Sequence, residues 1–146
     1  MNIDIQVKQY KIVGGDLKNA GRVSEEIKML LEQMKYDTRI VRRASICIFE
    51  AEMNVVMYAE KGVVDLVATP QKIEMVVRDA GQGIPDIRRA LQEGYSTATE
   101  EMREMGFGAG MGLPNIKNNA DTFEITSEVG KGTRLTIVLN AKGGAN

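Results

Sequence analysis

The sequence predicts an α+β protein, a two-layer sandwich in which helices pack on one face of a mixed, mainly antiparallel sheet. Two long segments, residues 16–34 and 38–59, carry apolar residues at helical spacing. Five shorter segments have the alternation or the apolar runs that are typical of strands. Helical and strand-like segments do not alternate regularly along the chain, and this favours a sandwich whose helices are gathered in one layer.

The N-terminal half of the chain predicts one strand and both long helices. An edge strand is expected over residues 2–13, and Gly14-Gly15 ends it. Asp16 is the expected N-cap of the first helix. The apolar positions of that helix are Val23, Ile27, Leu30, Leu31 and Met34. Asp37 or Thr38 is expected to cap the second helix. The stripe that this helix is predicted to bury comprises Val41, Ala44, Ile48, Ala51 and Val55.

The middle of the chain predicts a β-hairpin followed by a mobile cover. Strands are expected at 63–68 and 73–78, and because a short turn joins them they should be antiparallel neighbours. Asp79 then stands at the end of the second strand, where a rigid element holds it. Residues 84–105 are polar and helix-prone, and the segment is long for a plain connection. We expect it to form a lid over a ligand site.

The C-terminal part predicts a short helix and two strands. The helix is expected over residues 113–119, with Pro114 in its first turn. The final strands are expected at 123–128 and 133–139, and residues 141–146 are expected to be a frayed tail. No internal repeat is visible, and a length of 146 residues fits a single domain over 1–146.

Net charge, the distribution of basic residues and the cysteine content bear on which partners and sites are expected. The formal net charge is −1, so there is no general electrostatic reason to expect nucleic-acid binding. A local basic cluster at Arg39, Arg42 and Arg43 is either a solvated helix face or a docking patch for an acidic partner. Cys47 is the only cysteine and is expected to be a small buried side chain.

The location and the available chemistry follow from what the sequence lacks. No apolar run approaches the roughly 20 residues that span a bilayer, and the first residues lack the apolar stretch of a signal peptide, so we expect a cytoplasmic protein with no membrane segment. The chain has no histidine. Histidine-based acid–base catalysis and histidine metal sites are therefore excluded, and carboxylates remain as candidate bases.

Three polar motifs are the candidates for a ligand site. Glu50 and Asn54 are four residues apart, so on a helix they lie on one face. Asp79-x-Gly-x-Gly places a carboxylate beside glycines that let the backbone approach a flat ligand. A glycine ladder follows, and its backbone N–H groups could hold an anion: Gly106, Gly108, Gly110 and Gly112. Taken singly these are more often an exposed helix face, a turn and a flexible loop; their occurrence together favours a site.

Two other glycine-loop interpretations fit poorly. A dinucleotide-binding loop should follow a strand directly, whereas the residues before this ladder, 98–105, are charged and lack strand alternation. A P-loop needs Gly-x-x-x-x-Gly-Lys-Ser/Thr, and Lys131 is followed by Gly132 with no glycine at the required offset.

The order of the three motifs, followed by Gly130-Lys131-Gly132-Thr133, resembles the ATP-binding module shared by gyrase, Hsp90, histidine kinases and MutL, the GHKL superfamily with its Bergerat fold. The resemblance covers roughly residues 10–140. The small size and the run Gly-Met-Gly-Leu-Pro-Asn-Ile are similar to the anti-sigma-factor and switch serine kinases of bacteria. A sensor histidine kinase needs a phosphoacceptor histidine, which this chain cannot supply.

The resemblance implies a nucleotide site with ATP and Mg²⁺ as cofactors. Asp79 would accept a hydrogen bond from the adenine amino group, directly and through water, and Thr133 would join that network. Gly81 and Gly83 would leave room for the base. Asn54 would complete the coordination of Mg²⁺. The residues implied to wrap the phosphates or border them are Gly106, Gly108, Gly110, Met111, Gly112 and Leu113.

The resemblance also implies a catalytic pair. Glu50 would orient or deprotonate the attacking hydroxyl, and Arg103 in the lid would supply positive charge beside Mg²⁺. Lys117 is a second candidate for that charge. Arg22 corresponds weakly to an arginine that contacts the protein partner in the switch kinases, because an extra glycine precedes it here. Met57-Tyr58 departs from the family, which often has a histidine or similar polar residue at this point.

Two functions follow from the resemblance. The first is a serine/threonine kinase that transfers the γ-phosphate of ATP to a Ser or Thr of a STAS (anti-anti-sigma) partner. The second is a nucleotide-gated binding module that sequesters a sigma factor or activates a phosphatase without turnover. The resemblance also allows a homodimer, and neither function requires nucleic acid or a membrane.

Overall fold

The computed structural model describes residues 5–81, 83–84, 87–92 and 112–141. The predicted tail beyond residue 141 and most of the predicted lid lie outside this part of the chain. So do five predicted site residues, Arg103, Gly106, Gly108, Gly110 and Met111.

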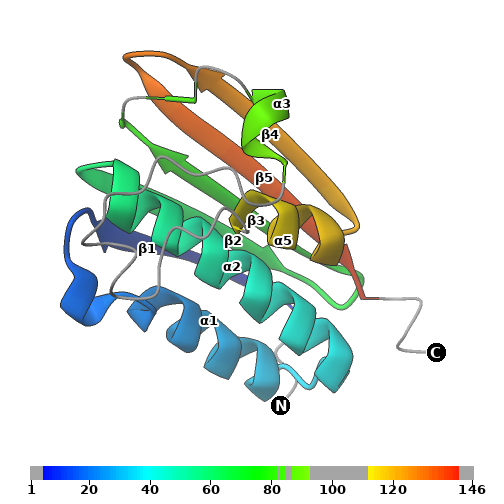
Figure 1. The fold of residues 1–146 in the computed structure, drawn as a ribbon. Coiled ribbons are helices and arrows are strands. Elements are labelled where there is room, and N and C mark those ends of the chain that lie inside the picture. The colour runs from blue at the N-terminus through cyan, green and yellow to red at the C-terminus, as the bar shows by residue number, and fades with distance from the viewer. Residues whose placement is uncertain (1–4, 82, 85–86, 93–111, 142–146) are drawn as a thin grey trace.

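The described residues form one antiparallel sheet with helices on one face, which confirms the predicted sandwich (Figure 1). The strands are β1 (Gln6–Val13), β2 (Lys61–Ala68), β3 (Lys72–Asp79), β4 (Thr122–Glu128) and β5 (Gly132–Asn140). The helices are the 3₁₀ turn η1 (Leu17–Asn19), α1 (Arg22–Gln33), α2 (Thr38–Tyr58), α3 (Ile87–Ala90) and α5 (Gly112–Asn119). The sheet order is β1-β2-β3-β5-β4, so β1 is an edge strand as predicted.

Every strand pair among the described residues is antiparallel, so the sheet is more uniform than the predicted mixed arrangement. The β2–β3 hairpin is antiparallel as predicted, and its register places Leu66 opposite Met75 and Gly62 opposite Asp79. Alternate residues of the inner strands are buried under the helices, whereas the other face of the sheet is covered by no described helix (Figure 1). Apolar alternation therefore determines which face of the sheet forms the core.

Helix α2 crosses the sheet and supplies the largest share of the helical core. Asp37 is its N-cap, since its side chain accepts a hydrogen bond from the Arg39 backbone N–H at 2.8 Å. That bond lowers the pKa of Asp37. All five residues of the predicted stripe are buried. Cys47 is also fully buried, as expected, and burial raises the pKa of its thiol to about 12.

The predicted start of the first helix at Asp16 is wrong. Asp16 does act as a cap, but it caps the short η1 turn, where its carboxylate accepts from the Asn19 backbone N–H at 3.4 Å. Ala20 is extended and Gly21 has φ +97°, so the chain leaves helical geometry before α1 begins at Arg22. A positive φ is readily adopted only by glycine, so Gly21 marks the break between the two elements. Leu30 and Met34 are only half-buried, whereas the other three apolar positions are buried.

Glu52 of α2 caps the start of α1 from a distance. Its Oε1 accepts from the Ser24 N–H at 2.8 Å, and its Oε2 accepts from the N–H groups of Gly21 and Val23 at 3.1 and 3.2 Å. Only 2% of Glu52 is exposed. The first N–H groups of a helix lack partners within the helix, and the helix dipole favours a negative charge there. The buried carboxylate thus satisfies three donors and fastens α1 to α2.

Arg43 joins α2 to the other side of the helical layer. Its Nε donates to the Asn119 carbonyl and its Nη2 donates to Asp121 Oδ1, each at 2.9 Å. Burial would raise the pKa of Asp121, but hydrogen bonds from the Asn140 backbone and Arg43 outweigh it and the pKa falls below its usual value. Arg43 is therefore a structural member of the predicted basic cluster. Among the described residues, no helix is both long and apolar enough to cross a bilayer.

We expect Glu52→Ala to lower the free energy of unfolding by about 2–4 kcal/mol, because three buried N–H donors lose a charged acceptor. Urea unfolding followed by circular dichroism measures the change, and Glu60→Gln, at an exposed position, is the control. Equal stability of the Ala variant and the control would show that the cap contributes little.

Candidate functional site

The predicted site residues that the structure describes gather along one side of α2 and at the ends of the elements beside it. Glu50 and Asn54 are both half-buried and stand one turn apart on α2. Asp79 ends β3, and Thr133 is its partner in the ladder with β5. Gly112 begins α5. Described residues of the first two motifs thus lie on α2 and at the end of β3, whereas of the glycine ladder only Gly112 is described.

The Glu50 carboxylate lies against the start of α5. Its Oε2 accepts a hydrogen bond from Asn115 Nδ2 at 3.0 Å, and a Cβ added to Gly112 would stand 3.5 Å from Oε1. Asn115 was missed by sequence reasoning, because its amide meets Glu50 only through the packing of α5 on α2.

Asn54 lies on α2, one turn after Glu50. Within the described part of the chain, no group hydrogen-bonds to its side chain, although the residue is half-buried. The described residues contain no group of three or more His, Cys, Asp or Glu that could hold a metal ion. A single amide oxygen fits Mg²⁺ that takes its remaining ligands from water and phosphate oxygens.

The Asp79 carboxylate is fixed by its own loop. Its Oδ1 accepts from the Gly81 backbone N–H at 2.8 Å, and among the described residues nothing hydrogen-bonds to Oδ2. Asp79 faces Gly62 on one side and Thr133 on the other in the strand register. Asp79 is half-buried, and among the described residues the turn engages only Oδ1.

The glycines around Asp79 are required by neighbouring backbone. A Cβ at Gly81 would lie 2.9 Å from the Tyr58 carbonyl, and one at Gly83, where φ is +81°, would lie 2.5 Å from the Glu128 carbonyl. At Gly132 the φ is +130° and a Cβ would lie 2.0 Å from the Asp79 carbonyl oxygen. Glycine at these positions lets the loop lie against α2, β4 and β5, a reason for glycine that the motif alone did not indicate.

Ser127 is a second residue that sequence reasoning missed. Its Oγ lies 3.0 Å from Thr133 Oγ1 and accepts from the Ile84 N–H at 2.7 Å. The serine thus connects Thr133 to the segment that follows Gly83. Its place on β4 beside Thr133 follows from the register of the last hairpin, so correct pairing of 123–128 with 133–139 could have revealed it.

The positions of Leu113 and Lys117 do not support a direct role of their side chains at the site. Leu113 is buried in the core, so its side chain is not available to a ligand. Lys117 is exposed in the last turn of α5, whereas Glu50 contacts the first turn. The structure does not bring the Lys117 side chain into contact with Glu50.

Comparisons with known proteins give a family match and several relatives. Residues 40–143 match the family described as histidine kinase-, DNA gyrase B-, and HSP90-like ATPase. The chain is 29% identical over 111 residues to the serine/threonine-protein kinase RsbT of Bacillus subtilis, with 73% of this chain and 77% of RsbT covered. It is 32% identical over 93 residues to the anti-sigma F factor of Caldanaerobacter subterraneus, covering 60% of this chain and 62% of that relative.

Two solved structures share the fold. The RsbU and RsbW domains of Rv1364c from Mycobacterium tuberculosis superpose with a TM-score of 0.59 at 18% identity, covering 90% of this chain and 31% of that one. The mycobacterial sensor histidine kinase MprB superposes with a TM-score of 0.50 at 14% identity, covering 94% of this chain and 99% of that one. At these identities the likeness establishes the fold alone.

We expect Gly132→Ala to destabilise the protein more than Gly130→Ala. Both positions have positive φ, so each alanine should cost about 1 kcal/mol of backbone strain. A Cβ at Gly130 meets nothing within 4 Å, whereas at Gly132 it would collide with the Asp79 carbonyl. Thermal unfolding of the two variants measures the difference. Equal losses of stability would contradict the close approach of Gly132 to Asp79.

Proposed function

The chain belongs to the family of histidine kinase-, DNA gyrase B- and HSP90-like ATPases, and from this premise we propose how its residues act. It is a regulatory serine/threonine protein kinase of the kind represented by its relatives RsbT and the anti-sigma F factors. We propose that it transfers the γ-phosphate of ATP to a Ser or Thr of a STAS-domain partner. The chain aligns with only 62% of the anti-sigma F factor named above, so we place sequestration of a sigma factor second to the kinase function.

The nucleotide base would bind at the end of β3. The Oδ2 atom of Asp79 is free of the turn that holds Oδ1, so it can accept a hydrogen bond from an exocyclic amine. The Thr133 hydroxyl, held beside Ser127, would form a second polar contact at this site. Support comes from the close packing at Gly81 and Gly132, which holds the end of β3 at Asp79 against α2 and β5.

The phosphates would extend from there along α2 toward α5. Asn54 would hold Mg²⁺ through its side-chain oxygen, and the ion would neutralise charge on the phosphate oxygens. The N-terminus of α5, beginning at Gly112, lies beside Glu50 at the far end of this path. Backbone N–H groups at a helix N-terminus favour an anion, so the start of α5 would bind a phosphate.

Glu50 would act on the phosphoacceptor hydroxyl. The hydroxyl oxygen attacks the γ-phosphorus and forms the new P–O bond while its proton passes to the Glu50 carboxylate. The bond between the γ-phosphorus and the β–γ bridging oxygen breaks, and ADP leaves with that electron pair. Asn115 holds Oε2, which leaves Oε1 oriented for the proton. This fixed carboxylate, one turn from Asn54, is the observation that carries the proposal.

The proposal predicts that the wild-type chain, with ATP and Mg²⁺, phosphorylates a purified STAS protein from its own genome. Glu50→Gln should lower kcat about 100-fold or more, because the base is lost while the side-chain shape is kept. Transfer of radiolabelled γ-phosphate, with the site identified by mass spectrometry, is the measurement. Absence of phosphorylation of every STAS protein of that genome would overturn the kinase proposal.

A second set of variants separates positioning from folding. Asn115→Ala should lower kcat on the order of tenfold with an unchanged KM for ATP, because Glu50 loses its fixed orientation. Asn115→Gln, which keeps an amide donor, should recover part of the rate. Asn118→Ala, on the exposed side of the same helix, is the matched control. A rate for Asn115→Ala equal to that of this control would remove Asn115 from the catalytic arrangement.

A further inference from the structure

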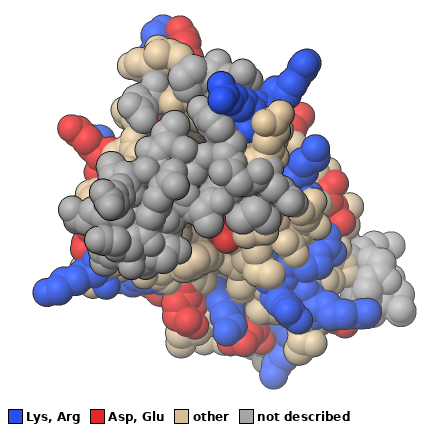
Figure 2. Space-filling model, in the orientation of Figure 1, with Lys and Arg blue, Asp and Glu red and all other residues tan. Residues whose placement is uncertain are grey.

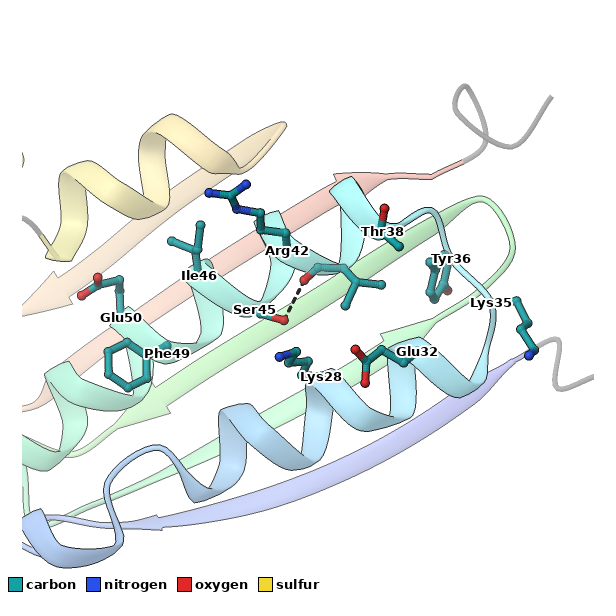
Figure 3. A pocket seen from close by; sticks show the side chains of 11 residues that line it. Lys28, Glu32, Lys35, Tyr36, Thr38, Arg42, Ser45, Ile46, Phe49 and Glu50 are labelled. Atoms are coloured by element: carbon teal, nitrogen blue, oxygen red, sulfur yellow. Dashed lines mark hydrogen bonds between the residues drawn. The ribbon is translucent and has the colours of Figure 1, made fainter.

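A groove runs along the solvent side of α2 where α1 packs beside it. Its volume is about 810 Å³, and both helices and the Lys35–Tyr36 connection contribute to its lining. Figure 3 shows Lys28 and Glu32 on α1, and Arg42, Ile46 and Glu50 in succession along α2. We call this feature the α1–α2 groove. The stretch of α2 from Thr38 to Glu50 is about 18 Å long, enough for roughly three turns of a bound helix.

The wall that α2 gives to the groove is apolar in its middle. Val41 is buried, Ile46 is half-buried, and Phe49 is 39% exposed despite its large ring. Ser45 between them has its hydroxyl committed to the Val41 carbonyl at 2.7 Å. An exposed aromatic and an aliphatic side chain at helical spacing offer the kind of anchor that recognises an apolar side chain of a protein partner.

Positive charge flanks this apolar strip. Lys28, Lys35 and Arg42 are all exposed, and none of them forms a salt bridge with a described residue. The acids of the groove are Glu32 and Glu50, and Glu50 is already held by Asn115. Figure 2 shows Lys and Arg side chains gathered where the N-terminal half of α2 lies, although the whole chain has a net charge of −1. Three cations against two acids leave the lining of the groove with a net positive charge, which is complementary to an acidic segment.

The groove also leads to the catalytic end of the site, since Glu50 belongs to both. A polypeptide lying along the groove would have one end beside the carboxylate that is proposed to accept the hydroxyl proton. This continuity identifies the occupant as the substrate protein, because a partner that only regulated the kinase would not need to reach Glu50.

We propose that the α1–α2 groove docks an acidic amphipathic segment of the phosphoacceptor protein. Carboxylates of that segment pair with Lys28, Lys35 and Arg42, and an apolar side chain lies on Ile46 and Phe49. The acceptor hydroxyl is thereby delivered to Glu50. The inference rests on the proposed kinase function and adds the recognition surface for its substrate. It also assigns Arg42 to docking, whereas Arg43 of the same basic cluster is structural.

The test compares two double variants with the same change of charge. Lys28→Glu/Arg42→Glu reverses two cations of the groove, and Lys11→Glu/Lys72→Glu reverses two exposed lysines of strands β1 and β3. The probe is a STAS protein of the same genome, and the readouts are its KM and kcat as substrate, its affinity by calorimetry, and the affinity for ATP.

We expect the groove variant to raise the KM for the STAS protein about tenfold or more and to weaken its binding equally, with a loss that shrinks at high salt. Affinity for ATP should be unchanged, and the control variant should behave as wild type. An unchanged KM and affinity in the groove variant would overturn the docking proposal. If a STAS protein binds wild type, binds the groove variant more weakly and is phosphorylated by neither, the kinase proposal alone is contradicted.

Discussion

The buried Glu52 carboxylate is the contact on which the arrangement of the helical layer depends. It accepts hydrogen bonds from three N–H groups at the start of α1, and the Ser24 hydroxyl donates to the Gly21 carbonyl at 2.9 Å to complete the turn. A buried charge without partners would be costly, so the carboxylate selects the one packing that supplies all three donors. Since α1 forms one side of the α1–α2 groove, this cap also shapes the surface proposed for substrate docking.

Two carboxylates of helix α2, Glu50 and Glu52, point in different directions and have different surroundings. Successive helical residues differ by about 100°, so Glu50 and Glu52 point to nearly opposite sides of the helix. Glu52 turns toward α1 and is buried, whereas Glu50 turns toward α5 and remains half-exposed. The apolar stripe between them packs on the sheet. One helix thus holds the fold together with one carboxylate, Glu52, and carries the other, Glu50, which is proposed to act on the substrate.

The sequence was sufficient where local pattern determines the structure. The stripe of α2, the hairpin ending at Asp79 and the short helix with Pro114 all follow from periodicity and turn chemistry, and each was predicted. It was insufficient where a contact joins distant segments. The positive φ of Gly21, which ends helical geometry before α1, could not be predicted from the apolar periodicity. The hydrogen bonds of Glu52, Asn115 and Ser127 form only when packing brings their partners within reach. The roles of Gly106, Gly108 and Gly110 stay predictions, since these residues lie outside the described chain.

Calorimetric titration of ATP with magnesium into the wild type and Asp79→Asn is the sharpest test of the nucleotide site. The substitution removes the acceptor character of Oδ2 while an asparagine Oδ1 can still accept from Gly81, so the turn should persist and the unfolding midpoint should stay close to that of wild type. We predict one micromolar site in the wild type and no measurable binding in the variant. No binding to the wild type, or equal binding to both proteins, would contradict a kinase whose nucleotide is recognised by Asp79.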